Sequence, residues 1–172
     1  MTKRKMTKRK MSKYKYNTPE MALEAVKECG WNLEHVRPKL QTPEMIEMAL
    51  KDLNYRLEHV RPNLITPEMA LEAVRRHGWN LEYVPAHLQT PKMAEMAVEE
   101  WGYNFKFVRP DLQTPEFTEM AVKEWSWVLE FVPAHLQTKE VIEAALKHDP
   151  SAKKFIKVKG LMMNALEEAL AF

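Results

Sequence analysis

The residues that could carry chemistry in this chain are six histidines, one cysteine and a set of arginines that recur at fixed spacing. His35 and His59 share one place in a 24-residue period, and His87 and His135 share another. Equivalent residues on packed helices lie about 8–10 Å apart, whereas every ligand of a zinc ion lies about 2 Å from it. The first of these places otherwise holds aromatic residues, so we predict packing roles for His35 and His59 and no metal site.

Catalytic motifs do not stand out in the sequence. It has no phosphate-binding loop, no His-Glu-x-x-His and no nucleophile elbow, and no Ser, His and Asp are spaced so that they would converge. Cys29 falls on the predicted buried face of a helix, where an inert thiol is expected. A single cysteine also excludes an internal disulfide and suits a reducing compartment. We therefore predict neither an enzyme nor a bound cofactor.

The arginines point to recognition of a partner. Arg37, Arg61 and Arg109 share position 20 of the period, where Pro85 and Pro133 stand in the other repeats. Position 22 varies from repeat to repeat, and variation at an exposed position is how repeat proteins distinguish their partners. The predicted partner-binding residues are Arg37, Lys39, Arg61, Asn63, His87, Arg109, Asp111 and His135.

A strict repeat positions these residues. Threonine returns every 24 residues and defines repeat position 1, and alanine returns in step at position 8. A period of this length without insertions is typical of a solenoid. The threonines are Thr18, Thr42, Thr66, Thr90, Thr114 and Thr138, and the alanines are Ala25, Ala49, Ala73, Ala97, Ala121 and Ala145.

Each repeat is predicted to form two helices. Threonine followed by proline is a strong helix start, and apolar residues at positions 4, 5, 8, 9 and 12 form one helical face. Glycine at position 13 predicts a left-handed C-terminal cap. A shorter second helix is expected to begin at an asparagine cap and to be broken or kinked by proline at position 20 or 21. These caps are Asn32, Asn80 and Asn104.

The predicted fold is an all-α solenoid over residues 17–172. Five full repeats span 18–137, a degenerate sixth spans 138–161, and a capping helix spans 162–172. No apolar run approaches the 18 residues that a membrane-spanning helix needs, and the N-terminal region lacks the apolar stretch of a secretory signal.

Two charged columns accompany the first helix of each repeat. Position 3 is acidic and position 10 is basic in five of the six repeats, an arrangement that the helix dipole favours. The fourth repeat reverses both signs with Lys92 and Glu99. The dipole does not explain this reversal, which suggests a local difference in recognition.

Position 12 carries tryptophan in the fourth and fifth repeats. Trp101 and Trp125 stand where the earlier repeats have Cys29, Leu53 and His77. Larger core side chains are the favoured interpretation, and an exposed binding surface is the alternative.

The net charge of +2 conceals a strongly basic N-terminal segment. Residues 1–16, here called the basic arm, hold eight lysines and arginines and no acid, while the rest of the chain has 18 basic and 24 acidic residues. We predict a disordered arm that contacts nucleic acid or an acidic protein surface, or that acts as a nuclear-import signal in a eukaryotic host. Its basic residues are Lys3, Arg4, Lys5, Lys8, Arg9, Lys10, Lys13 and Lys15.

The repeats resemble an uncharacterised family of tandem short helical repeats, known only as a domain of unknown function. The resemblance rests on Ala25-Val26-Lys27 before Gly30-Trp31 and on Leu33 to Val36, with the same pattern around Gly78-Trp79. It covers roughly residues 18–161 and implies no catalytic residue or cofactor. Because such repeats occur in bacteria, protists and their viruses, it also suggests a viral or mobile-element factor that binds a host protein.

The sequence therefore predicts a non-enzymatic scaffold that binds a partner protein through the concave face of a solenoid. The alternative is a nucleic-acid-binding protein that uses the basic arm. Neither interpretation includes a membrane, and the expected location is the cytoplasm or another reducing intracellular compartment, or the nucleus of a eukaryotic host.

Overall fold

A computed structural model describes residues 14–51 and 56–158 of this chain. The basic residues from Lys3 to Lys13 and the predicted capping helix 162–172 lie outside the described residues, and the predictions about them stay predictions.

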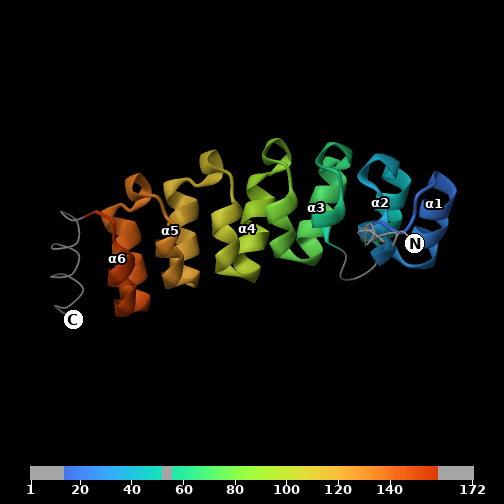
Figure 1. The fold of residues 1–172 in the computed structure, drawn as a ribbon. Coiled ribbons are helices and arrows are strands. Elements are labelled where there is room, and N and C mark those ends of the chain that lie inside the picture. The colour runs from blue at the N-terminus through green and yellow to red at the C-terminus, as the bar shows by residue number, and fades with distance from the viewer. Residues whose placement is uncertain (1–13, 52–55, 159–172) are drawn as a thin grey trace, which may run out of the picture. The chain divides into compact units, whose positions relative to one another are not determined.

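The described residues form an all-α structure, as predicted. One α-helix begins each repeat, directly after the repeated threonine (Figure 1). These helices are α1 (Pro19–Glu28), α2 (Pro43–Ala49), α3 (Pro67–Arg76), α4 (Pro91–Glu100), α5 (Pro115–Glu124) and α6 (Lys139–His148).

The threonine caps are confirmed in all six helices. Each threonine has extended backbone angles, and its hydroxyl accepts a hydrogen bond from the backbone N–H three residues later. At α3, for example, Thr66 Oγ1 accepts from the N–H of Met69 at 3.2 Å. Such a cap stabilises a helix by about 1 kcal/mol.

The second half of each repeat differs from the prediction, because it forms short 3₁₀ helices where a second α-helix was expected. Proline at position 20 or 21 limits each segment to a few residues. The longer segments are η1 (Gly30–His35), η5 (Gly78–Tyr83), η7 (Gly102–Phe107), η9 (Ser126–Glu130) and η11 (Pro150–Phe155), and the three-residue ones are η2 (Pro38–Leu40), η3 (Leu57–His59), η4 (Pro62–Leu64), η6 (Ala86–Leu88), η8 (Pro110–Leu112) and η10 (Ala134–Leu136).

The asparagines predicted as caps of the second helix have a different role. Asn80 lies inside η5 and is 1% exposed, and its Nδ2 donates to the carbonyl of Ala73 at 3.0 Å. Asn104 and Asn32 make the same bond to the carbonyls seven residues before them. These side chains give a second hydrogen bond to a carbonyl in the last turn of the preceding α-helix, which also accepts the backbone N–H of the C-terminal cap residue.

The glycines also differ from the prediction, because none of the described ones has a positive φ angle. Gly78 and Gly102 are required by close packing between repeats. A Cβ atom on Gly78 would lie 2.7 Å from the Cα of Ala97, and one on Gly102 would lie 2.6 Å from the Cγ of Trp125. A side chain at either position would force the adjacent repeats apart.

The chain divides into two compact bodies. Of the described residues, the N-terminal body comprises 14–51 and 59–64, and the C-terminal body comprises 56–58 and 65–158. Within the first body α1 packs on α2; within the second, α3, α4, α5 and α6 pack on one another in chain order (Figure 1). A single solenoid running through both bodies stays a prediction.

The core of each repeat is built from small and branched apolar side chains. The position-8 alanines are at most 5% exposed in all six repeats, which lets neighbouring helices approach closely. The valines or leucines at position 9 and the leucines or Phe105 at position 16 are buried beside them.

A buried glutamine at position 24 joins three pairs of successive repeats. The side chain of Gln89 donates from Nε2 to the carbonyl of Phe107 at 3.0 Å, and its Oε1 accepts the backbone N–H of Arg109 at 2.9 Å. Gln41 makes the same pair of bonds with residues 59 and 61 of the N-terminal body, and Gln137 makes it with residues 155 and 157 of the C-terminal body. We call this arrangement the glutamine bracket.

The glutamine bracket explains the alternation of arginine and proline at position 20. Proline has no backbone N–H to donate. Before Pro85, position 24 holds the buried apolar residue Ile65. Before Pro133, it holds Gln113, whose Nε2 turns back to the carbonyl of Val108 in its own repeat at 2.7 Å. Arginine at position 20 of the second and fourth repeats therefore supplies the backbone N–H that the glutamine of the preceding repeat accepts, and proline stands where no such hydrogen bond forms.

Candidate functional site

The variable residues predicted to meet a partner are exposed. All five lie in three-residue 3₁₀ helices, η2, η4, η6, η8 and η10, and all five are exposed. They are Lys39, Asn63, His87, Asp111 and His135. Binding by this column stays a prediction.

The arginines predicted beside them are half-buried and bond within the protein. Arg109 Nη1 donates to the carbonyl of Ala86 at 3.0 Å, and Nη2 pairs with Asp111 at 2.8 Å. In the N-terminal body Arg61 reaches the carbonyl of Pro38 at 3.4 Å, and Arg37 donates to Asn17 at 2.8 Å. Arg61 and Arg109 thus join successive repeats, and Arg37 bonds to the residue that precedes the first repeat, roles that the sequence did not predict.

The histidines at position 18 of the first two repeats share one carboxylate. Glu34 lies 3.0 Å from His35 Nε2 and 3.5 Å from His59 Nε2. In the described part of the chain, no three His, Cys, Asp or Glu side chains are grouped as a metal ion would need. The same residues include no helix with the length and hydropathy that a membrane crossing requires.

Cys29 is exposed, which corrects the prediction of a buried thiol. It is the C-terminal cap of α1, and its extended backbone turns its side chain away from the apolar face that the helical period had assigned to it.

Six aromatic side chains of the C-terminal body form a continuous surface group, here called the aromatic cluster. The ring centroids of Trp101 and Tyr103 lie 5.0 Å apart, and Tyr103 meets Phe131 edge-on at 5.4 Å. The ammonium group of Lys106 lies 3.7 Å from the ring centroid of Tyr103. The members are Trp101, Tyr103, Phe107, Trp125, Trp127 and Phe131.

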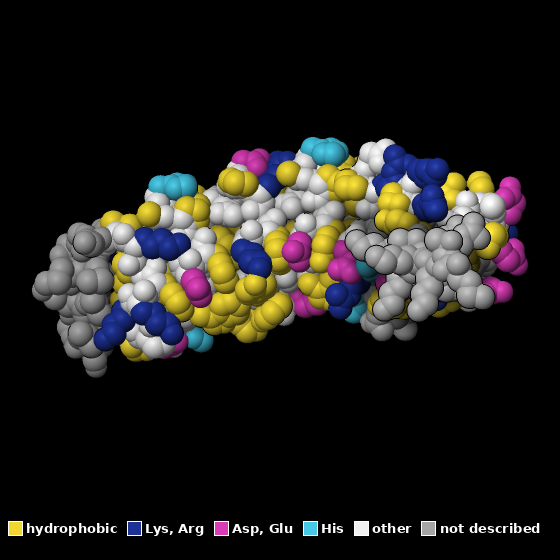
Figure 2. All heavy atoms as spheres, viewed as in Figure 1, with side chains coloured by type: hydrophobic (Ala, Val, Ile, Leu, Met, Phe, Trp, Pro, Cys, Tyr) yellow, Lys and Arg dark blue, Asp and Glu magenta, His cyan; other side chains and the backbone are white. Residues whose placement is uncertain are grey.

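Of the two tryptophans at position 12, one fits the prediction of a larger core side chain and the other fits the prediction of an exposed surface. Trp125 is partly buried beneath Gly102, and its Nε1 donates to the carbonyl of Val98 at 3.1 Å, so it joins repeats. Trp101 keeps 50% of its surface exposed. Figure 2 shows hydrophobic side chains gathered around the lower ends of α4 and α5 in that view.

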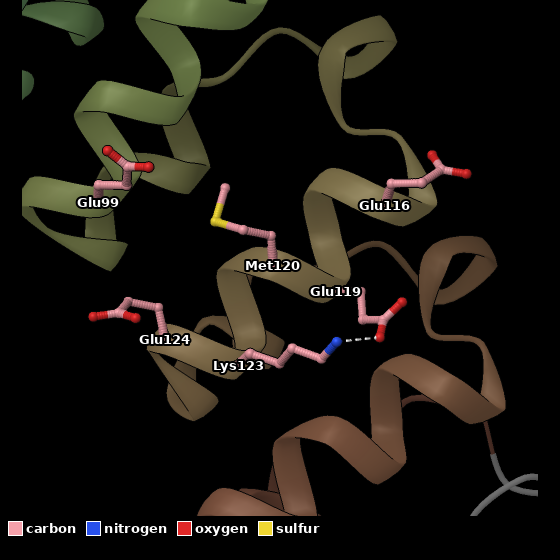
Figure 3. A pocket seen from close by; sticks show the side chains of 6 residues that line it. All are labelled: Glu99, Glu116, Glu119, Met120, Lys123 and Glu124. Carbon is pink, nitrogen blue, oxygen red and sulfur yellow. Dashed lines mark ion pairs between the residues drawn. The ribbon is translucent and has the colours of Figure 1, made fainter.

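A groove runs between α4 and α5, both in the C-terminal body. One hollow of about 430 Å³ is lined by Glu99, Glu116, Glu119, Met120, Lys123 and Glu124 (Figure 3). An adjoining hollow of about 330 Å³ shares three of these residues and adds an apolar floor that includes Leu112 and Phe117. We call the two hollows together the α4–α5 groove.

The rim of the groove is negatively charged. Its one lysine, Lys123, pairs with Glu119 at 2.6 Å, which leaves the other carboxylates without compensation from it. The pKa of Glu116 is lowered, first by a hydrogen bond from its own backbone N–H and then by the Thr114 hydroxyl. Glu116 is therefore ionised at neutral pH.

One feature of the sequence marks this groove, although its place in the structure could not be predicted. Glu99 is the acidic exception in a column that is otherwise basic, and it faces the space into which Met120 extends from α5 (Figure 3). A lysine there, as in the other repeats, would neutralise much of the rim. No protein-family model matches this sequence, and comparison with curated proteins and with solved structures likewise gives no match.

Proposed function

We propose that this protein is a non-enzymatic binding protein that holds a partner protein on the exposed surface of its helical repeats. The aromatic cluster supports this proposal most directly, since half of the Trp101 side chain faces solvent within a group of six contacting rings. Tryptophan and tyrosine dominate the binding energy of protein interfaces because they bury a large area with few rotatable bonds.

The framework around the cluster is suited to presenting it. Trp125 is held by its bond to the carbonyl of Val98, and Tyr103 is held between the rings of Trp101 and Phe131. A surface whose side chains are fixed before binding loses less entropy when the partner arrives.

The acidic rim of the nearby groove favours a protein over a nucleic acid as the partner. Phosphate groups would be repelled by Glu99 and Glu124, which lie within two residues of Trp101 and Trp125 in the chain. The nucleic-acid alternative depends on the basic arm, most of which lies outside the described residues.

Affinity capture with a matched pair of variants tests the proposal. Trp101→His introduces the residue that occupies this position in the third repeat, so it keeps the repeat pattern while removing the exposed indole. Trp31→His makes the same change at a tryptophan of the N-terminal body that is 40% exposed. We expect Trp101→His to reduce retention of the partner about 10-fold or more, and Trp31→His to leave it unchanged.

Treating the extract with nuclease separates the two classes of partner. A protein that is retained after nuclease treatment and released by Trp101→His supports the proposal. If no protein responds to Trp101→His, or if everything that responds is lost with nuclease, binding through the aromatic cluster is wrong.

A further inference from the structure

We infer that the α4–α5 groove binds a Lys/Arg-rich segment of the partner protein that inserts one long apolar side chain between the acidic residues. This inference rests on the proposed function, because it assigns the chemistry of the partner to a second feature of the same body.

The lining of the groove combines apolar residues with a long side chain that extends between the two helices (Figure 3). Met120 reaches from α5 toward α4, and Glu99 faces it from the other helix (Figure 3). Below them lies Phe117, whose ring stacks on the buried ring of Phe105 at 5.7 Å and 9°. The floor is therefore fixed by the core, while the thioether of Met120 can adapt to different side chains.

The charge of the groove selects basic neighbours for that side chain. Carboxylates of Glu95, Glu99 and Glu124 line it, together with Glu116 and the paired Glu119. A rim of one sign around an apolar floor attracts a segment of opposite charge and orients it as it docks.

The reversed charge in α4 makes this groove different from its equivalents. Position 10 is Lys27, Lys51, Arg75, Lys123 or Lys147 in the other repeats, and only the fourth repeat has an acid there. Helix dipoles favour a base at this position, so Glu99 works against the stability of α4. Binding of a basic segment would account for an acidic residue at a position where the helix dipole disfavours it.

Fluorescence anisotropy with purified full-length protein tests the inference. The probe is a fluorescein-labelled peptide KRKLKRK, compared with KRKGKRK, which lacks the apolar residue, and with EDELEDE, which reverses the charge. We expect the first peptide to bind tightest and the acidic one not to bind. Raising NaCl from about 50 mM to about 300 mM should weaken binding about 10-fold, because the shorter Debye length screens the rim.

Two groove variants reproduce residues that other repeats tolerate at the same positions. Glu99→Lys restores the common basic residue, and Met120→Ala copies Ala144 of the sixth repeat, so both should fold. We expect Glu99→Lys to weaken KRKLKRK binding about 10-fold or more, and Met120→Ala to make KRKLKRK bind no tighter than KRKGKRK. The control Glu82→Lys makes the same change of net charge on the exposed surface of η5, outside the groove, and should have little effect.

Several results would overturn the inference. Unchanged binding in Glu99→Lys would show that the peptide binds outside the groove. Equal losses in Glu99→Lys and Glu82→Lys would show that the peptide responds only to overall charge. Sedimentation of the full-length protein covers another occupant: self-association that disappears in Glu99→Lys would mean that a second copy, and not a partner, fills the groove. Because the peptide assay does not involve Trp101, it can fail while capture through the aromatic cluster succeeds, and the reverse.

Discussion

Two junctions between successive repeats of the C-terminal body differ in one backbone N–H, and the glutamine at position 24 bonds differently in each. Gln137 is 1% exposed and donates to the carbonyls of Leu129, Val132 and Phe155, while its Oε1 accepts the N–H of Lys157 at 2.7 Å. Gln113 occupies the equivalent position and is only half-buried, and the residue that would donate to it is Pro133. The amide of Gln113 bonds within its own repeat. Glutamine at position 24 therefore joins two repeats at one junction and not at the other.

The largest difference between the two junctions should appear when each glutamine is removed. Gln137→Ala leaves several buried backbone groups without a partner, so we expect it to lower the free energy of unfolding by about 2–4 kcal/mol. Gln113→Ala should cost less than about 1 kcal/mol, because the half-buried Gln113 side chain makes a single hydrogen bond within its own repeat. Urea denaturation measures both, and equal losses would mean that the glutamine bracket contributes nothing of its own.

Arg109→Pro should convert a bracketed junction into a proline junction. The φ angle of Arg109 is −60° and Val108 has an extended backbone, so proline fits both residues. Loss of the N–H strands the buried Oε1 of Gln89, and we expect a loss of about 1–3 kcal/mol in the free energy of unfolding.

Two further variants isolate the cause of that loss. Arg109→Ala keeps the N–H and removes only the guanidinium contacts, so it should cost less than Arg109→Pro. Adding Gln89→Ile to Arg109→Pro reproduces the natural combination of Ile65 and Pro85 and should recover part of the stability. No recovery would count against this explanation of the alternating column.

Pro133→Ala should have a smaller effect and act in the opposite direction on Gln113. The new N–H gives Gln113 Oε1 a donor, while the unfolded chain gains entropy worth about 0.4–1 kcal/mol, so the net change should be near zero. A double-mutant cycle with Gln113→Ala should show a coupling of about 0.5–1.5 kcal/mol. Zero coupling would show that the bond to Val108 holds Gln113 in its own repeat.

Lowering the pH should reduce the free energy of unfolding of the protein. It should not change the difference in cost between Gln137→Ala and Gln113→Ala. Hydrogen bonds from Arg75 and Arg76 lower the pKa of Glu72 from 4.5 to about 2, and bonds from their own N–H groups and capping threonines lower the pKa of Glu68 and Glu140. Because the folded-state pKa values are depressed, this stabilisation is complete above about pH 4.5 and is lost as the pH falls toward 2.

The glutamine bracket consists of amide groups that do not titrate in this range. The cost of Gln137→Ala should therefore be the same at pH 7 and pH 4, as chemical denaturation at both pH values would show. A cost that changes with pH would point to a charged group within the bracket.

Features that depend on neighbouring residues could be predicted from the sequence. The threonine caps, the six helix starts and the buried alanine column follow from local hydrogen bonding and from the helical period, and the structure confirms them. The length and type of the second segment could not be predicted in the same way. Proline indicates a break, but packing against the next repeat decides that the segment is 3₁₀.

The candidate site was predicted only in part for the same reason. Exposure of the position-22 column followed from its variability, whereas the internal bonds of Arg61 and Arg109 required knowledge of which carbonyl the next repeat presents. Glu99 was recognised as an exception without its location, because a groove exists only once α4 and α5 are packed side by side.

The repeat and the charge pattern are properties of the sequence, and the helix starts and the all-α class follow from it, since caps and the helical period act within about one helical turn. The tertiary structure alone decided that Gly78 makes room for Ala97, that Asn80 bonds to the carbonyl of Ala73 and that Trp101 is exposed while Trp125 is partly buried. These outcomes depend on which atoms of adjacent segments come within bonding distance. The 24-residue period indicates that successive repeats pack on one another. Which atoms each side chain contacts is decided by the packed structure.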